Sequence, residues 1–203
     1  MSKLQFKNKW VLVTGASSGL GEEMSRQLAY QHGANLILLA RRRDKLEQLK
    51  AELEKETNVK VKVIVADLSS LEEVDKAIDE ILKDGQLYGA ILNAGVTYFG
   101  RHSELTWQQF ETMLQTNVVS VIRFTNRLVA HFEASGNEGG MLIVSSMAGI
   151  FPVSYQSAYS GTKAFILSFA RALAHEIKNK RFSLSVYAPG GIISEMTAGD
   201  NFH

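Results

Sequence analysis

The sequence of 203 residues has no cysteine, two prolines and almost no excess of charge. Without cysteine it cannot be a disulfide scaffold, bind a metal through thiolates or use a cysteine nucleophile. Its formal net charge of +1 argues against a general nucleic-acid binder, because such proteins usually carry a strong positive balance. The five histidines lack the spacing of zinc ligands. We therefore expect neither a metal ion nor a nucleic acid as a partner.

Long hydrophobic runs are also missing. The longest weakly polar stretch, around residues 141–153, contains two serines and a proline and falls short of the roughly 20 residues of a membrane helix. Residues 1–10 lack the apolar core of a signal peptide. We expect a cytoplasmic protein without membrane contact. The length of 203 residues, with no linker, low-complexity tract or internal repeat, predicts a single domain over residues 1–203 with a sizeable core.

Six short apolar runs alternate with longer amphipathic segments. Runs that are short and apolar on both sides are typical of strands in a parallel sheet covered by helices on both faces. The alternation predicts a Rossmann-type α/β fold of three layers, with a doubly wound parallel sheet in the order 3-2-1-4-5-6. The predicted strands are residues 10–13, 35–40, 60–66, 89–92, 141–145 and 182–187.

The segments between the runs repeat apolar residues every three or four positions, as amphipathic helices do. The longest predicted helix extends from about Trp107 to Phe132. The next predicted helix begins near Tyr159. Its apolar residues on one face are Phe165, Phe169, Leu173 and Ile177.

A glycine-rich turn joins the first strand to the first helix, with the spacing G-x-x-x-G-x-G over residues 15–21. Such glycines permit a tight turn, a close approach to a pyrophosphate and close packing of the helix on the strand. The helix N-terminus offers free N–H groups to phosphate. A plain turn with a helix cap is the alternative, but this position favours nucleotide binding. We predict cofactor contacts from Gly15, Ser17, Ser18, Gly19, Leu20 and Gly21.

Three arginines follow the second strand, where an NAD site usually has an acidic residue. A carboxylate repels a 2′-phosphate, whereas a guanidinium pairs with it. The sequence therefore predicts NADP(H) as the cofactor. Arg41 is the first candidate for this contact, since it is nearest to the strand end, and Arg42 is the second. A solvated first helical turn is the alternative interpretation, which we prefer for Arg43.

Polar residues of a possible catalytic site lie on the fifth strand end and the following helix. Tyr159 and Lys163 are four residues apart and share a helical face. A lysine cation favours the phenolate, so it would lower the tyrosine pKa from about 10 toward neutrality. Ser145 and Ser146 end the fifth run, at the sheet edge where ligands bind. A surface pair and a turn or helix cap are the respective alternatives.

With these motifs in this order, the sequence resembles the short-chain dehydrogenase/reductase family along nearly its whole length. Residues 14–21 are similar to the family's T-G-x-x-x-G-x-G, residues 93–95 to its N-A-G and residues 189–190 to its P-G. The resemblance implies contacts with adenine and nicotinamide from residues that follow several strands. These further cofactor contacts are Asp67, Leu68, Asn93, Ala94, Gly95, Tyr159, Lys163, Pro189, Gly190, Ile192 and Ser194.

The resemblance also implies a catalytic tetrad. The family's serine lies thirteen residues before the tyrosine, which selects Ser146 rather than Ser145. Tyr159 would exchange a proton with the substrate oxygen, and Ser146 would hydrogen-bond it. Lys163 would lower the tyrosine pKa and bind the nicotinamide ribose, and Asn117 would position Lys163 through a water. The implied reaction interconverts a carbonyl and a secondary alcohol on a small or medium apolar substrate.

Four apolar residues flank the predicted site, namely Phe99, Ile150, Phe151 and Tyr155. Such residues would line an apolar substrate pocket, pack in the core or contact a second copy of the chain, and the sequence leaves these roles open.

The resemblance implies a homodimer through the helices that begin near Trp107 and Tyr159. Members of the family usually continue with a substrate-covering region, a last strand and a last helix, and we expect these to be lacking because the sequence ends at His203. Two other functions stay open on the same fold. One is a non-catalytic NADP(H)-binding regulator or scaffold, and the other is a non-redox enzyme that holds NADP.

Overall fold

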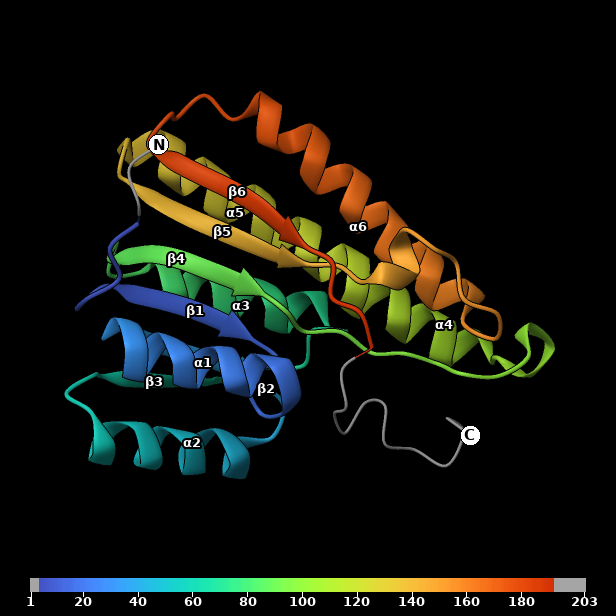
Figure 1. The fold of residues 1–203 in the computed structure, drawn as a ribbon, viewed down its shortest axis with the longest axis horizontal. Coiled ribbons are helices and arrows are strands. Elements are labelled where there is room, and N and C mark those ends of the chain that lie inside the picture. The colour runs from blue at the N-terminus through green and yellow to red at the C-terminus, as the bar shows by residue number, and fades with distance from the viewer. Residues whose placement is uncertain (1–3, 192–203) are drawn as a thin grey trace.

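A computed structural model describes residues 4–191. They form a parallel six-stranded sheet in the order β3-β2-β1-β4-β5-β6 (Figure 1), which confirms the predicted fold class. Parallel neighbours require crossover connections, and helices supply them here. The strands are β1 (Trp10–Thr14), β2 (Asn35–Ala40), β3 (Val61–Val65), β4 (Leu87–Leu92), β5 (Gly139–Val144) and β6 (Phe182–Tyr187).

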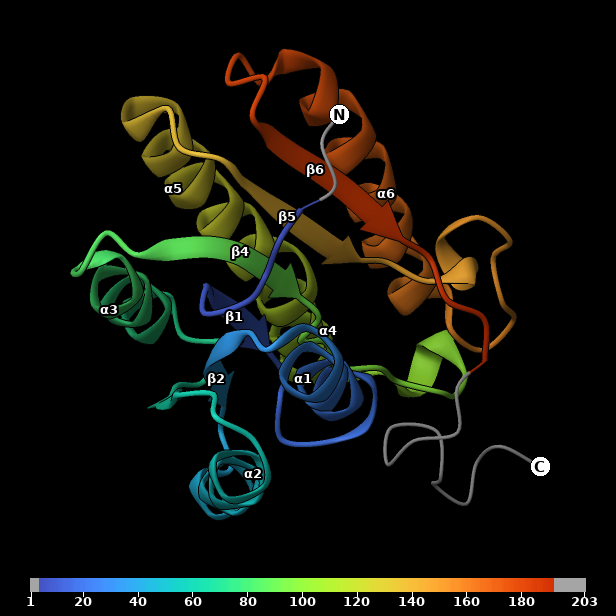
Figure 2. The same ribbon diagram turned by 60° about the vertical axis from the view of Figure 1, so that its left-hand side comes forward.

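Helices lie on both faces of the sheet, with α1 and α2 on one and α3, α5 and α6 on the other (Figure 2). Side chains alternate accordingly along β1. Val11 and Val13 are buried under α1 and α2, whereas Leu12 belongs to the opposite core. The helices are α1 (Gly19–His32), α2 (Arg43–Glu56), α3 (Leu71–Leu82), α4 (Trp107–Leu114), α5 (Ser120–Ser135) and α6 (Ser157–Glu176). None of the helices between residues 4 and 191 has the length and apolarity to cross a membrane.

The long helix predicted from Trp107 to Phe132 is interrupted. A π-helical turn, Gln115–Val119, joins α4 to α5 and directs Asn117 into the interior. Turns of this kind often occur at functional sites, because the extra residue re-aims a side chain without ending the helix. Apolar periodicity runs through the turn unbroken, so it could not reveal this feature.

The apolar face predicted for α6 is buried only toward its end, where Ile177 is 5% exposed and Leu173 packs against the core. Phe165 is 51% exposed and stacks on Phe169, with ring centroids 6.4 Å apart. The helix instead buries a neighbouring face that carries small, polar and aliphatic side chains. The physical reason is that α6 presents Lys163 to the end of β5, where its ammonium finds a backbone carbonyl. The buried residues of this face are Ser160, Thr162, Lys163, Ile166, Leu167 and Ala170.

Candidate active site

A cavity of about 740 Å³ lies at the carboxyl edge of the sheet, where residues that follow all six strands contribute to its walls. This is the edge at which ligands bind in open parallel sheets. Each predicted site residue between positions 4 and 191 lines the cavity, except Gly21 and Asn117. These two contact residues of its wall. The predicted contacts of Ile192 and Ser194 lie outside the described residues.

The glycine turn depends on the absence of side chains at two positions. Gly15 has a φ of +68°, and a Cβ there would lie 2.9 Å from the Cα of Ala94. A Cβ on Gly21 would lie only 2.4 Å from the carbonyl oxygen of Gly15. The turn therefore brings α1 against β1 and the loop after β4 more closely than any other residue permits.

Thr14 fixes this turn to the loop after β4. Its Oγ1 accepts hydrogen bonds from the backbone N–H groups of Asn93 and Ala94, at 3.0 and 3.1 Å. Asn93 Nδ2 in turn donates to the Thr14 carbonyl at 3.1 Å. The sequence motif included this threonine, but sequence reasoning assigned it no role. Its hydroxyl ties the ends of β1 and β4 into one rigid side of the cavity.

The first turn of α1 is open toward the cavity. Gly19 and Leu20 line the wall, and the Ser18 side chain at the N-cap accepts no hydrogen bond from the helix. The N–H groups of a helix start need acceptors, and the helix dipole favours an anion there. This turn therefore fits the pyrophosphate of a dinucleotide.

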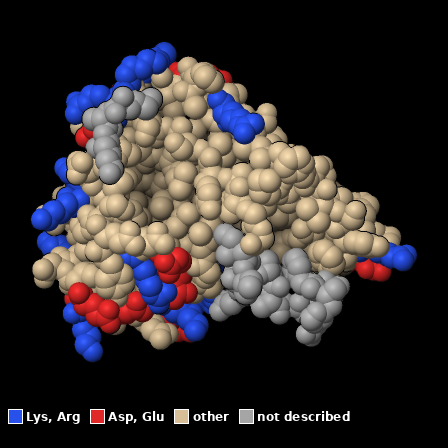
Figure 3. Space-filling view, in the orientation of Figure 1, with Lys and Arg blue, Asp and Glu red and all other residues tan. Residues whose placement is uncertain are grey.

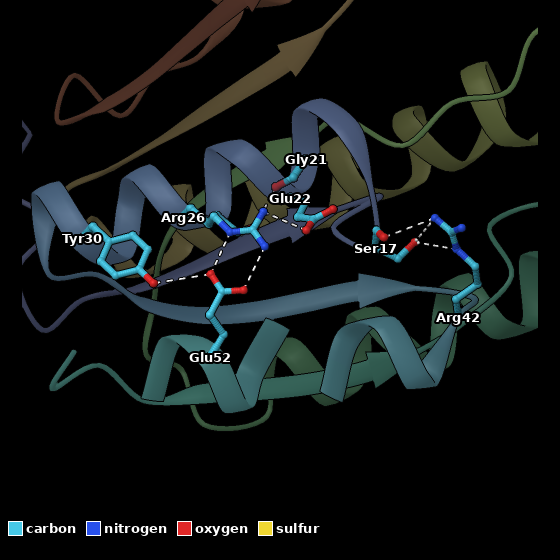
Figure 4. A network of polar contacts seen from close by, with 8 residues as sticks. Ser17, Gly21, Glu22, Arg26, Tyr30, Arg42 and Glu52 are labelled. Atoms are coloured by element: carbon cyan, nitrogen blue, oxygen red, sulfur yellow. Dashed lines mark hydrogen bonds and ion pairs between the residues drawn. The ribbon is translucent and has the colours of Figure 1, made fainter. Parts of the chain in front are cut away.

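Two arginines line the cavity at the end of β2, and Figure 4 shows one of them, Arg42, next to Ser17 of the glycine turn. Arg42 donates from Nε and Nη2 to Ser17 Oγ at 3.3 Å and from Nη2 to the Ser17 carbonyl at 3.2 Å. Arg41 Nη1 lies 3.9 Å from Asp67 Oδ2, and the Arg41 side chain is 64% exposed. The arginine ranked second is thus the one attached to the turn. Both guanidinium groups fit a phosphate, whereas Arg43 does not line the cavity.

Farther along α1, a second arginine network fastens this helix to α2 (Figure 4). Arg26 pairs with Glu22 at 2.7 Å and with Glu52 at 2.7 Å. The hydrogen bond from Arg26 lowers the pKa of Glu52. Because α1 carries the glycine turn, this contact supports the cavity from outside.

At the other end of the cavity, Lys163 and Tyr159 project from α6. Lys163 is 5% exposed, and its Nζ donates to the Val144 carbonyl at 3.1 Å. The same nitrogen lies 5.8 Å from the centroid of the Tyr159 ring. Burial lowers the pKa of Lys163 to about 8. The two side chains therefore meet at the cavity, as their spacing predicted.

The predicted lowering of the tyrosine pKa is wrong for this arrangement. Burial raises the pKa of Tyr159 above its ordinary value, and a side-chain hydrogen bond with Ser146 acts in the opposite direction. Lys163 stays beside the ring and directs its ammonium to the Val144 carbonyl. A phenol with a raised pKa stays protonated at neutral pH, which suits a proton donor.

The two serines after β5 have different surroundings. Ser145 is 2% exposed, and its hydroxyl donates to the Lys163 carbonyl at 2.8 Å. Ser146 accepts a hydrogen bond from the Ala148 N–H at 3.1 Å and bonds to Tyr159. The serine beside the phenol is thus the one that the thirteen-residue spacing selected.

Asn117 uses its amide to fix the loop after β4. Its Oδ1 accepts from the Val96 N–H and its Nδ2 donates to the Val96 carbonyl, both at 2.8 Å. Nδ2 also lies 3.1 Å from the hydroxyl of Thr162, which precedes Lys163 on α6. A Cβ on Gly95 would lie within 3.4 Å of both Asn117 Oδ1 and Lys163 Nζ. The structure thus brings Asn117 close to Lys163, and the connection through a water stays a prediction.

Sequence reasoning missed one polar pair that lines the cavity near Tyr159. Gln156 Nε2 donates to Thr97 Oγ1 at 3.1 Å, which joins the start of α6 to the loop after β4. No family motif contains this pair, so only the fold reveals it. Within residues 4–191, no cluster of three or more His, Cys, Asp or Glu side chains is arranged to hold a metal ion.

Comparison with known proteins relates this site to one family. Residues 9–202 match the family model for the short chain dehydrogenases. The 17-beta-hydroxysteroid dehydrogenase type 3 of Rattus norvegicus is 32% identical over 198 residues, which cover 97% of this chain and 64% of the relative. The chain thus spans less than two thirds of the length of that curated relative.

Two solved structures extend the comparison to cofactors. A short-chain dehydrogenase from Sphingobium yanoikuyae in complex with NADPH is 28% identical, with a TM-score of 0.88 over 93% of this chain and 73% of the other. The 3-ketoacyl-(acyl-carrier-protein) reductase from Brucella melitensis complexed with NADH is 26% identical, with a TM-score of 0.84 over 94% of this chain and 78% of the other.

Proposed function

The chain belongs to the short chain dehydrogenase family, and we propose that it is an NADP(H)-dependent oxidoreductase that interconverts a carbonyl and a secondary alcohol. One observation carries the proposal. Ser146, Tyr159 and Lys163 converge at one end of a cavity whose other end holds an open helix N-terminus and two arginines. A dinucleotide laid between these ends would place its nicotinamide near the phenol.

The roles of the side chains follow from their contacts. Ser146 donates a hydrogen bond to the substrate oxygen and orients it toward Tyr159. In the reducing direction the Tyr159 hydroxyl gives its proton to the developing alkoxide, and in the oxidising direction the phenolate accepts it. Lys163 lies beside the Tyr159 ring, with its Nζ 5.8 Å from the ring centroid, and Asn117 holds the loop after β4 next to it. The bound cofactor supplies or accepts the hydride.

The choice of NADP(H) rests on the arginines, since solved relatives were crystallised with either cofactor. Arg41 and Arg42 both line the cavity at the end of β2. Asp67 stands near Arg41, so this end of the cavity also carries one negative charge. The two guanidinium groups outweigh it and favour a 2′-phosphate.

We also keep the homodimer, the single domain and the cytoplasmic location as proposals. The dimer is supported by large apolar side chains on the two helices that the sequence indicated. Trp107 at the start of α4 is 74% exposed and Phe165 on α6 is 51% exposed. Aromatic side chains of this kind are typical of protein interfaces.

A paired titration tests the cofactor assignment. NADPH and NADH are added separately to the purified chain and followed by cofactor fluorescence. We expect tighter binding of NADPH by about tenfold or more, because a phosphate paired with arginine contributes a charged hydrogen bond. Arg41→Asp and Arg42→Asp should each reduce this preference, and Arg43→Asp is the matched control outside the cavity.

Two outcomes would contradict the proposal at different points. A preference for NADH would remove the role of the arginines and leave the enzyme class intact. Full turnover in Tyr159→Phe with a confirmed substrate would overturn the mechanism itself, while retained cofactor binding in that variant shows that the protein is folded.

A further inference from the structure

Within the part of the chain that the structure describes, the catalytic end of the cavity has fewer charged side chains than the cofactor end. Among the described residues that line the cavity, the charged ones are Arg41, Arg42, Asp67 and Lys163. The first three lie at the cofactor end, and Lys163 is buried with its ammonium on a backbone carbonyl. Uncharged residues therefore surround the position of a substrate next to Tyr159. They are Val96, Thr97, Met147, Ala148, Val153 and Gln156.

An exposed apolar surface continues outward from this end. It consists of the segment 147–155, which we call the apolar loop. Met147 and Val153 belong both to the cavity wall and to the outer surface, where they are 37% and 42% exposed. Ile150 and Phe151 lie between them in sequence and are 41% and 65% exposed. Figure 3 shows a broad area without charged side chains right of centre, bounded by charged groups at the far right edge, while most charged side chains gather at the lower left, over α1 and α2.

The apolar loop is fixed relative to the catalytic residues. The Met147 N–H donates to the Pro189 carbonyl at 2.8 Å, and the Val153 N–H donates to the Ser160 hydroxyl at 3.2 Å. A Cβ on Gly149 would lie 2.6 Å from the Lys163 backbone, so the loop packs directly on α6. The backbone of the apolar loop is thus anchored to α6 and to the segment after β6, and Met147 and Val153 line the same cavity as Tyr159.

We infer that the substrate is an uncharged carbonyl compound whose apolar body extends from the cavity onto the apolar loop. This inference rests on the proposed function, because the carbonyl must reach Ser146 and Tyr159. The body would cover Met147 and Val153 first, and a bulky one would reach Ile150 and Phe151. A charged group on the substrate would lose its hydration at this end and find no described counter-ion, which disfavours sugar phosphates and free carboxylates.

The apolar loop is continuous with the cavity, and this continuity indicates that a substrate covers it. Core packing is excluded for Ile150, Phe151 and Tyr155, since all three are more than 40% exposed within the described residues. A second copy of the chain seated on the loop would cover the residues that border the cavity and hinder entry of the substrate. An apolar substrate covers the same residues without that conflict. When no substrate is bound, these residues are exposed because the entrance of the cavity is open.

The test compares three ketones with NADPH and the purified chain. They are trans-1-decalone, cyclohexanone and 4-oxocyclohexanecarboxylate, which share a ring ketone and differ in apolar bulk and charge. We expect kcat/KM to be highest for the decalone, at least about tenfold above cyclohexanone, because the additional methylene groups are buried. The carboxylate should be the poorest of the three. A carboxylate turned over as well as cyclohexanone would overturn the inference.

Variants locate the binding surface. Phe151→Ser should raise the KM for the decalone about fivefold while kcat and the KM for cyclohexanone stay unchanged. Ile150→Ser should act in the same direction, and Leu71→Ser is its matched control, because Leu71 on α3 is a similarly exposed aliphatic residue at 45%. If Phe151→Ser changes only the sedimentation coefficient, the loop contacts a second copy and the inference is wrong.

A binding measurement separates this inference from the proposed function. If no ketone is reduced, the proposed function fails, and the decalone is titrated by calorimetry into the chain saturated with NADPH. Binding that is weakened by Ile150→Ser and unaffected by Leu71→Ser would still support the apolar substrate site. Absence of binding would overturn it.

Discussion

The two ends of the cavity are built by different means. At the proposed cofactor end the backbone forms much of the wall, because Gly15 has a left-handed conformation and no side chain caps the first turn of α1. At the substrate end, side chains such as Met147 and Val153 make an apolar wall. Between the ends stand Ser146, Tyr159 and Lys163, the residues to which we assign the proton transfer.

Because of this difference, we expect the two ends to tolerate amino-acid substitutions to different degrees. A backbone site admits few alternatives, since one added methyl group collides with main-chain atoms that cannot move independently. An apolar wall accepts substitutions with graded effects, since recognition there is the sum of many weak contacts. Substitutions at the cofactor end should therefore act on binding and stability together, while those at the substrate end act on specificity alone.

The largest expected effect is on the rate of the reaction and leaves cofactor binding unchanged. Ser146→Ala should lower kcat/KM by roughly 10²- to 10³-fold, because the alkoxide loses one preorganised donor. NADPH affinity should stay the same. Steady-state kinetics on a confirmed ketone and a fluorescence titration with NADPH measure the two quantities.

Ser145→Ala is the matched control for this prediction. It removes a buried hydrogen bond to the Lys163 carbonyl, so it should reduce the free energy of unfolding by about 1–3 kcal/mol and affect the reaction less. The reverse outcome, with Ser145→Ala inactive and Ser146→Ala active, would exchange the roles of the two serines.

The pH dependence of stability tests whether the Lys163 ammonium is shielded from water. Its folded-state pKa of about 8 lies below the value near 10.4 of an unfolded chain. Below pH 8 the lysine is charged in both states, and the cost of burying that charge is fully present. Between about pH 8 and 10.4 the unfolded chain binds more protons, so the free energy of unfolding rises with pH, by roughly 3 kcal/mol in total.

Urea unfolding of the protein and of Lys163→Met at pH 7.5 and 10 measures this rise as a difference, which removes the contributions of other titrating groups. We expect the native protein to gain stability relative to the variant as the pH increases. A constant difference would mean that Lys163 keeps its ordinary pKa and is hydrated, and the contrast between a charged and an uncharged end would then be weaker.

The strands were largely predictable from sequence, since burial on both faces leaves continuous apolar runs. The runs at 35–40 and 182–187 coincide with β2 and β6. The face of α6 was not predictable, because the four-residue spacing of Phe165 and Phe169 is equally compatible with a core and with an exposed stripe. What decides the face is the contact of Lys163 with β5, which depends on tertiary structure.

The site divides in the same way. The glycine turn and the tyrosine–lysine pair were visible because local backbone geometry dictates their spacing. Contacts between distant segments were not, among them Thr14 with Asn93 and Gln156 with Thr97. Hydrogen bonds of this kind leave no periodicity in the sequence. The attachment of Arg42 to Ser17 likewise depends on where the turn after β1 meets the end of β2.

A substitution in the glycine turn tests whether the cofactor end is defined by its backbone. In Gly21→Ala the new Cβ would lie 2.4 Å from the Gly15 carbonyl oxygen and 2.6 Å from Asn93 Nδ2. Main-chain atoms must shift, so the free energy of unfolding should fall by about 1–3 kcal/mol, as in overpacked cores. The turn shifts with them, and NADPH affinity should fall as well, which thermal unfolding with and without NADPH reports.

Gly161→Ala provides the control, since it makes the same substitution within a helix where a Cβ meets no atom within 4 Å. This variant should be as stable as the native protein or gain up to about 1 kcal/mol, because alanine favours helices over glycine. Equal NADPH affinity in the two glycine variants would mean that side chains hold the cofactor, and the two ends of the cavity would then recognise their ligands by the same means.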